Sequence, residues 1–186
     1  GVEVIATGCA PALFDAVVIA THPDQALRLL AEPTAAEREV LGAIPYSTNL
    51  AQLHTDESVL PRRRRARASW NYLATDSDDR VVVSYDITRL MRLSGPRRFV
   101  VTLGGRDVVD QDTVIAEMTY AHPMYTVESV AAQQLLPTLN DDKVVFAGAY
   151  HGWGFHEDGA ASGLSAARHL GADWPVARPV AEAVAC

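Results

Sequence analysis

The sequence predicts a mixed α+β or α/β fold, in which two segments of alternating strand and helix flank a run of antiparallel strands. Near the N-terminus, short apolar segments are followed by helical patterns, and the same order returns after residue 143. Between them, alternating segments are separated by turn residues, as in antiparallel sheets. With 186 residues, 48% of them hydrophobic, the chain is long enough to bury a sizeable core.

Residues 1–43 are expected to form strands and helices in alternation. The expected elements are strands over 1–7 and 13–21 and helices over 24–30 and 34–41. The second strand is apolar on both faces, which is typical of a buried parallel strand. Pro23 stands where a proline opens a helix, and Thr34 precedes the next helix. Because residue 1 already lies in a strand pattern, we expect the chain to be the C-terminal portion of a longer one.

Residues 44–142 are expected to form a second domain, an antiparallel sheet with helices. The expected elements are strands over 44–56, 66–73, 80–86, 99–103 and 113–122 and helices over 88–93 and 127–139. A turn at Asp76–Asp79 closes a hairpin. The run Arg62–Arg65 resembles a phosphate or nucleic-acid patch, but the net charge of −7 favours a solvated loop.

Residues 144–171 are expected to form a buried strand, a glycine-rich turn and a helix. Asp158 is a suitable N-cap, and Gly171 stands where a C-cap glycine belongs. Ala160, Gly163 and Ala167 place small residues on one helix face, which lets a sheet or a flat ligand approach closely. The free N–H groups are expected near Gly159–Ala161, where a partly negative group would be stabilised.

This stretch resembles a known cofactor motif. The run Phe146-Ala147-Gly148, followed by Gly159-Ala160, Ser162-Gly163 and Ala166-Ala167, resembles the C-terminal FAD motif of the flavin-containing amine oxidase and phytoene desaturase superfamily. The sequence from Ala149 to Gly159 resembles that of a bacterial branch described as predicted NAD/FAD-binding oxidoreductases. The resemblance departs at Tyr150, where many members carry an acidic residue.

The resemblance implies a site and a division of the chain. The implied cofactor-binding residues are Gly148 and Ala149 near the FAD diphosphate and Glu157, Asp158, Gly159 and Ala160 near the flavin ring. The His22–Pro23 turn would lie near the flavin edge. The implied divisions are a returning FAD-domain segment (1–43), a substrate domain (44–142), a C-terminal FAD-binding strand-turn-helix (143–173) and a loose tail (174–186).

The implied reaction is hydride transfer from an organic substrate to flavin. His156 is the candidate catalytic residue, as a hydrogen-bond partner of the cofactor or an acid/base. Lys143 is the only lysine, and its place at a strand start does not match the lysine that amine oxidation uses in much of the superfamily. An unsaturated or lipid-like substrate is therefore at least as plausible as an amine. Aromatic candidates for an apolar pocket are Trp70, Tyr72, Tyr120, Tyr125, Trp153 and Phe155.

Other classes find less support in the sequence. No H-E-x-x-H or C-x-x-C motif indicates a metal, no apolar run reaches ~18 residues, and Ser162 lacks a G-x-S-x-G context. We expect a cytoplasmic protein that does not bind nucleic acid and has no membrane-spanning segment. No G-x-G-x-x-G is present, so a missing N-terminal dinucleotide-binding half is the expected partner. The alternative is a truncated, non-catalytic remnant or interaction module that does not bind FAD alone.

Overall fold

The computed structural model describes residues 1–74 and 81–172. It divides into two compact units: unit 1 contains residues 1–46 and the chain from residue 123 onward, and unit 2 contains residues 47–122. Mixed helices and strands with an antiparallel sheet give the α+β class that the sequence predicts. Residues 123–142 were expected in the same domain as the sheet, but they belong to unit 1. The expected turn at Asp76–Asp79 and the expected tail 174–186 lie outside the described residues.

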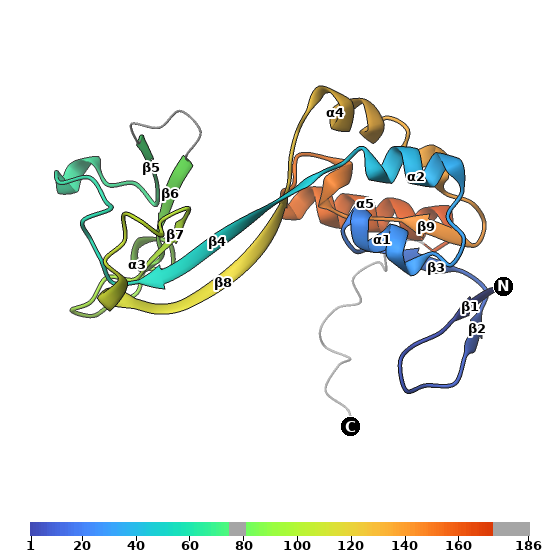
Figure 1. The fold of residues 1–186 in the computed structure, drawn as a ribbon, viewed down its shortest axis with the longest axis horizontal. Helices are drawn as coiled ribbons and strands as arrows, with labels where there is room; N and C mark the ends of the chain where they lie inside the picture. The colour runs from blue at the N-terminus through green and yellow to red at the C-terminus, as the bar shows by residue number, and fades with distance from the viewer. Residues whose placement is uncertain (75–80, 173–186) are drawn as a thin grey trace, which may run out of the picture. The chain divides into compact units, whose positions relative to one another are not determined.

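Unit 1 contains three short strands at its N-terminal side, one strand near the C-terminus, and helices between and after them (Figure 1). Its elements are β1 (Val2–Val4), β2 (Ala12–Phe14), β3 (Val17–Ile19), α1 (Pro23–Leu29), α2 (Ala35–Gly42), α4 (Val127–Gln133), η3 (Leu136–Leu139), β9 (Val144–Phe146), η4 (Ala149–His151) and α5 (His156–His169).

The strand expected over residues 13–21 is two strands. β2 pairs with β1 in an antiparallel hairpin, whereas β3 pairs with β9 in parallel, with Val17 opposite Val144. Asp15 stands between the two strands, and aspartate is depleted in strands. β2 is also not buried on both faces, since Leu13 is 78% exposed.

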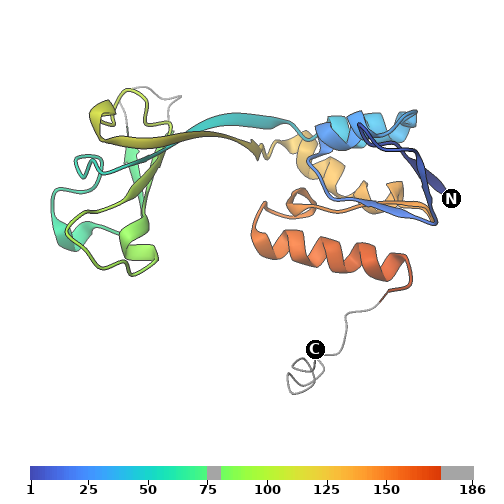
Figure 2. The same cartoon turned by 90° about the horizontal axis from the view of Figure 1, so that it is seen from below.

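The β3–β9 pair has helices on both faces, as Figure 2 shows for α5 on one side and α1 and α2 on the other. Phe146 packs into a cluster with residues of α1, α2, α4 and η3. The neighbouring residue Val145 packs instead against Ala166 of α5. This alternation of sides follows from the two-residue period of a strand. The core of unit 1 therefore lies around β9.

Helix ends in unit 1 follow local chemistry. Thr34 caps α2 as expected, because its side chain accepts from the N–H of Glu37, 3.1 Å away. The helix expected over residues 127–139 ends at Gln133 and continues as the separate 3-10 turn η3. Pro137 lies in that turn, and proline cannot donate the hydrogen bond that would continue an α-helix.

Unit 2 is built on a five-stranded sheet in the order β5-β6-β7-β4-β8. Its elements are β4 (Tyr46–His54), η1 (Arg64–Ala66), β5 (Trp70–Ala74), β6 (Val81–Asp86), α3 (Ile87–Leu90), β7 (Val100–Leu103), η2 (Gln111–Thr113) and β8 (Val114–Pro123). The expected hairpin is confirmed, with Trp70 of β5 opposite Tyr85 of β6. The run Arg62–Arg65 is exposed, as expected for a solvated loop.

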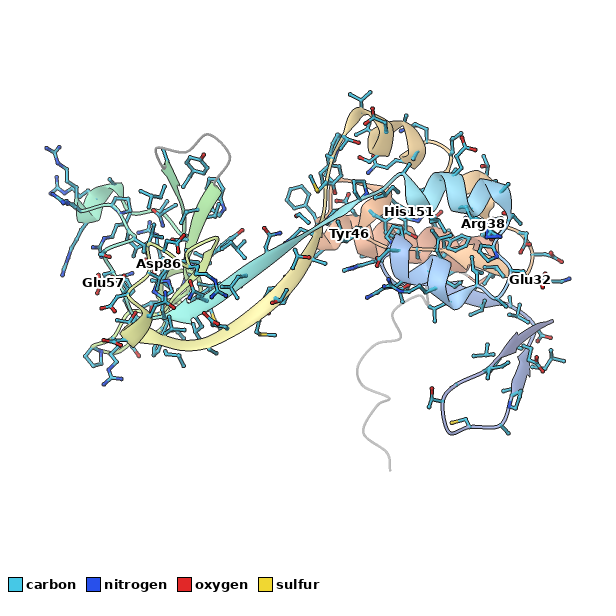
Figure 3. The ribbon with its side chains drawn as sticks, viewed as in Figure 1. Glu32, Arg38, Tyr46, Glu57, Asp86 and His151 are labelled. Carbon is cyan, nitrogen blue, oxygen red and sulfur yellow. The ribbon has the colours of Figure 1, made fainter. Side chains whose placement is uncertain are left out.

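One face of this sheet buries polar side chains that form hydrogen bonds with one another. His54, fully buried, lies 2.7 Å from the Thr102 hydroxyl through Nε2, and Thr102 lies 2.8 Å from the Ser84 hydroxyl. The Asp56 N–H donates to Nδ1 of His54, so the hydrogen of the neutral ring is on Nε2. At the same face, Arg98 donates to the buried carboxylate of Asp86, which is labelled in Figure 3.

Candidate cofactor site

The turn after β9 is fixed by glycine and by contacts to α5. Gly148 has φ 151° and ψ 163°, a conformation that side chains rarely adopt. Its N–H donates to the Ser162 hydroxyl over 2.9 Å, and that hydroxyl donates to the Gly159 carbonyl over 2.8 Å. A Cβ at Gly148 would lie 2.5 Å from a ring carbon of Tyr150. The turn therefore lies directly against the start of α5.

Helix α5 begins earlier than expected, so the predicted N-cap at Asp158 is wrong. The helix starts at His156, and the Asp158 carboxylate accepts from the N–H groups of Trp153, at 3.0 Å, and Phe155, at 2.9 Å. An acidic residue in the first turn can reach back in this way, as in a capping box. Asp158 thus closes the glycine-rich turn onto the helix.

This shift also corrects which N–H groups are free. The Gly159 N–H donates to the Phe155 carbonyl over 3.2 Å, so it is not one of the unpaired groups of the first turn. The groups without a helical partner are instead those of His156, Glu157 and Asp158, three residues earlier. The other end of the helix is as predicted: Gly171 has φ +80°, and Ala172 donates to the Ala167 carbonyl over 2.9 Å.

The small-residue face of α5 does not face the sheet. Ser162 and Ala166 are the buried side chains of the helix, whereas Ala160 and Gly163 are exposed. The exposed side borders an open groove of about 540 Å³, lined by Glu157, Ala160, Ala161, Leu164 and Arg168. Of the predicted small-residue face, Ala160 lines this groove, whereas Gly163 and Ala167 are not among the residues that line it.

The predicted cofactor residues lie in two neighbouring places. Gly159 is close to Ala149, because a Cβ on Gly159 would lie 3.8 Å from the Ala149 nitrogen. Glu157 and Ala160 lie on the open groove. His156, the candidate catalytic residue, is exposed at the first position of α5.

Two side chains in η4, the buried Tyr150 and the half-buried His151, were missed as site candidates. Among the described residues, neither the Tyr150 hydroxyl nor Nε2 of His151 has a hydrogen-bond partner. Burial raises the pKa of Tyr150 and lowers the pKa of His151, so both are neutral near pH 7. Gln133 holds their turn by donating to the carbonyls of Tyr150, at 3.0 Å, and Gly152, at 2.7 Å. The only sequence signal was that Tyr150 replaces an acidic residue.

The His22–Pro23 turn lies at the same edge of the sheet. Parallel strands end at one edge, so the segments after β3 and β9 are neighbours. His22 stacks on Tyr46 with ring centroids 4.3 Å apart (Figure 3 labels Tyr46). Burial, with the nearby Tyr125 and Asp24 charges, raises the pKa of Tyr46 to about 12, so its hydroxyl remains a donor.

The aromatic candidates do not form one cluster within either unit. Tyr125 and Trp153 lie together in unit 1, with ring centroids 5.3 Å apart, and Phe155 is 69% exposed. Trp70 and Tyr72 are both 54% exposed on β5, and Tyr120 lines a separate groove in unit 2.

Within residues 1–74 and 81–172, no three or more His, Cys, Asp or Glu side chains are grouped so that they could hold a metal ion. None of the described helices is both long and apolar enough to cross a membrane.

The comparison with protein families agrees with this geometry. A parallel strand followed by a glycine turn and a helix occurs in dinucleotide-binding folds and also in other α/β proteins. The model of the flavin containing amine oxidoreductase family matches residues 1–171. The chain therefore belongs to the flavin-containing amine oxidoreductase family, as the motif after β9 indicated. No curated protein matches the chain.

Proposed function

We propose that this chain binds FAD at the edge of the sheet where β3 and β9 end. We further propose that it is part of an FAD-dependent oxidoreductase that transfers a hydride from an organic substrate to the flavin. The observation that supports this most directly is the adjacency of the Gly148 turn to Gly159 of α5, within the segment that the family model covers. FAD supplies the hydride-accepting chemistry, and the protein supplies position and electrostatics.

The residues present fit such a cofactor. Gly148 and Ala149 bring backbone close to the carboxyl ends of the strands, where the diphosphate would bind. Ala160 borders the open groove without a bulky side chain, and Glu157 lies on the same groove. The free N–H groups of the first turn would stabilise negative charge on the ring. Asp158 supports the site by fixing the turn, and Gly159 leaves space beside Ala149.

His156 remains the proposed acid/base or hydrogen-bonding residue. It is the first residue of α5, and its side chain is exposed, so it is accessible to a ligand at the helix start. An imidazole side chain can donate or accept a hydrogen bond and can transfer a proton as a general acid or base.

We propose an unsaturated or lipid-like substrate in preference to an amine. Lys143 lies in the turn before β9, where its N–H donates to the Asp141 side chain over 2.8 Å. Unit 2 contains an apolar groove lined by aliphatic side chains and Tyr120. An apolar wall favours a hydrocarbon substrate over a charged ammonium group.

The competing proposal is an interaction module that does not bind FAD. Membership of a flavin oxidoreductase family over residues 1–171 favours the enzyme. The binding of FAD decides between them.

The test is FAD titration of the protein and of the variants Gly159→Asp and Ser165→Asp. Gly159→Asp places a carboxylate beside Ala149, where the ring and diphosphate are proposed to bind, whereas Ser165 is exposed and does not line the groove. Like-charge repulsion of about 1.4 kcal/mol or more would weaken FAD binding at least about tenfold in Gly159→Asp only. Circular dichroism checks that both variants fold. Absence of FAD binding by the parent protein would refute the proposal.

A further inference from the structure

One face of the sheet in unit 2 has no lysine, arginine, aspartate or glutamate on its described strands. Opposed residues share a face, so the registers place Trp70, Tyr85, Val101 and Leu53 on it. With their alternate neighbours, the residues of this uncharged face include Trp70, Tyr72, Val83, Tyr85, Val101, Leu103, Ser47, Asn49, Ala51, Leu53, Ala116, Met118, Tyr120 and His122.

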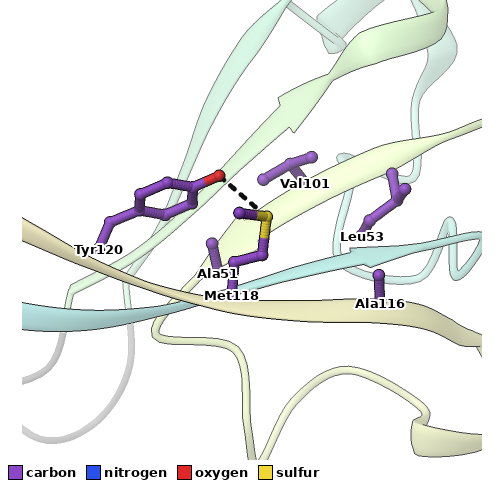
Figure 4. A pocket seen from close by; sticks show the side chains of 6 residues that line it. All are labelled: Ala51, Leu53, Val101, Ala116, Met118 and Tyr120. Carbon is purple, nitrogen blue, oxygen red and sulfur yellow. Dashed lines mark hydrogen bonds between the residues drawn. The ribbon is translucent and has the colours of Figure 1, made fainter. Parts of the chain in front are cut away.

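A groove of about 190 Å³ lies in this face. It is lined by Ala51, Leu53, Val101, Ala116, Met118 and Tyr120, and Figure 4 shows these side chains around it. The Tyr120 hydroxyl lies 3.1 Å from the Met118 sulfur, to which it donates, so the phenol does not offer the groove a free donor. Met118 is nevertheless 56% exposed. An open apolar surface of this kind is typical of a binding site.

The same face becomes polar toward the end of β8. Nδ2 of Asn49 lies 3.0 Å from the Ser47 hydroxyl and 3.1 Å from Nδ1 of His122. An amide nitrogen can only donate, so Nδ1 accepts and the hydrogen of the neutral ring is on Nε2. The rings of His122 and Tyr120 are 6.4 Å apart, so this donor is adjacent to the groove.

We propose that this uncharged face binds a long-chain fatty acid or fatty-acyl carboxylate, with its hydrocarbon chain in the groove and its carboxylate at Nε2 of His122. From Ala116 to His122 the strand spans roughly 20 Å, which suits a long chain and not a small apolar molecule. The Nε2–H group of His122 at the polar end complements an anion, and the face offers an ammonium group no carboxylate. This inference rests on the proposed function in taking the acid as substrate, and it narrows the lipid-like class to anionic acyl chains.

The test is displacement of the fluorescent polyene cis-parinaric acid from the protein, in the absence of FAD, by hexadecanoic acid, hexadecanol and hexadecylamine. The acid is expected to displace best and the amine worst. Among saturated acids, affinity is expected to rise about fourfold for each methylene that enters the groove.

Variants of two alanines in β8 provide a matched pair. Ala116→Phe fills the groove and is expected to weaken the binding of hexadecanoic acid at least tenfold. Ala121 is exposed on the opposite face, so Ala121→Phe is expected to leave this binding unchanged. His122→Ala is expected to weaken binding of the acid severalfold and binding of hexadecanol less, because the alcohol oxygen is an uncharged acceptor for the same N–H group. Circular dichroism confirms that each variant is folded.

Equal binding of acid, alcohol and amine, or equal effects of the two phenylalanines, would overturn the proposal. The proposal would also be overturned if the parent protein binds no acid but sediments as a dimer, and if Ala116→Phe dissociates that dimer. In that case a second copy of the chain would occupy the face. Since the assay contains no FAD, loss of FAD binding with retained acid binding refutes the proposed function alone. Retained FAD binding without acid binding refutes this inference alone.

Discussion

Gly148 offers the sharpest test of how the turn after β9 is built. Replacing it with alanine imposes a side chain on a backbone with φ 151°, and the new Cβ would lie 2.5 and 2.7 Å from ring carbons of Tyr150. That ring is 1% exposed and packed in the core of unit 1, so it has no free space into which to move.

The cost follows from two contributions. Backbone strain at such a position costs about 1–3 kcal/mol, and overpacking of a core costs about 1–3 kcal/mol. Gly148→Ala is therefore expected to lower the free energy of unfolding by roughly 2–6 kcal/mol. Gly163→Ala is the control: it lies in α5, and a Cβ there meets nothing within 4 Å. It is expected to stabilise the protein by about 0.5–1 kcal/mol.

The assay is urea unfolding followed by the helical circular-dichroism signal, which comes mainly from the helices of unit 1. The two glycine variants are expected to shift the midpoint in opposite directions. If Gly148→Ala unfolds at the same urea concentration as the parent protein, or if both variants shift alike, the turn does not have the geometry described.

Two further predictions concern buried groups. Tyr150→Phe removes a buried hydroxyl that has no hydrogen-bond partner among the described residues. The free energy of unfolding of the cofactor-free protein, measured in urea, is therefore expected to rise by about 1 kcal/mol. A decrease of that size would show that the hydroxyl has a hydrogen-bond partner. Burial lowers the pKa of His54 below 6.5, so the unfolded state binds the proton more readily and stability should fall as the pH drops below 6.5. His54→Gln should reduce this slope by up to about 1.4 kcal/mol per pH unit. Asp56 contributes to the pH dependence of stability in a separate pH range, below pH 3.8. Burial raises its pKa, but the N–H groups of Asp110 and Ser58 that donate to its carboxylate outweigh burial and lower the pKa. An unchanged slope between about pH 7 and 5 in His54→Gln would contradict the buried neutral ring.

Local signals predicted helix ends and strand pairs well where the chemistry was unambiguous. Thr34 and Gly171 mark a helix start and a helix end, because a hydroxyl cap and a left-handed glycine each satisfy groups within one turn. The hairpin of β5 and β6 followed from two alternating segments around a turn. Asp158 was ambiguous, because a carboxylate can serve free N–H groups from the cap position or from the third helical position.

Features set by long-range packing were not predictable. Residues 13–21 are continuously apolar, but pairing with β1 and with β9 divides them. In α5, small residues occupy two stripes, and only contact with Val145 and Ala147 shows that the stripe containing Ala166 is buried. The orphaned Tyr150 hydroxyl likewise exists only because helices from distant segments enclose it.

The most direct test of the central claim is an absorption spectrum of the protein expressed from its complete gene and purified without added cofactor. Flavin bands are expected in the visible range, and denaturation is expected to release a compound that chromatographs as FAD. A colourless protein that remains colourless after incubation with FAD and gel filtration would contradict the flavin oxidoreductase assignment. That result would favour the interaction module.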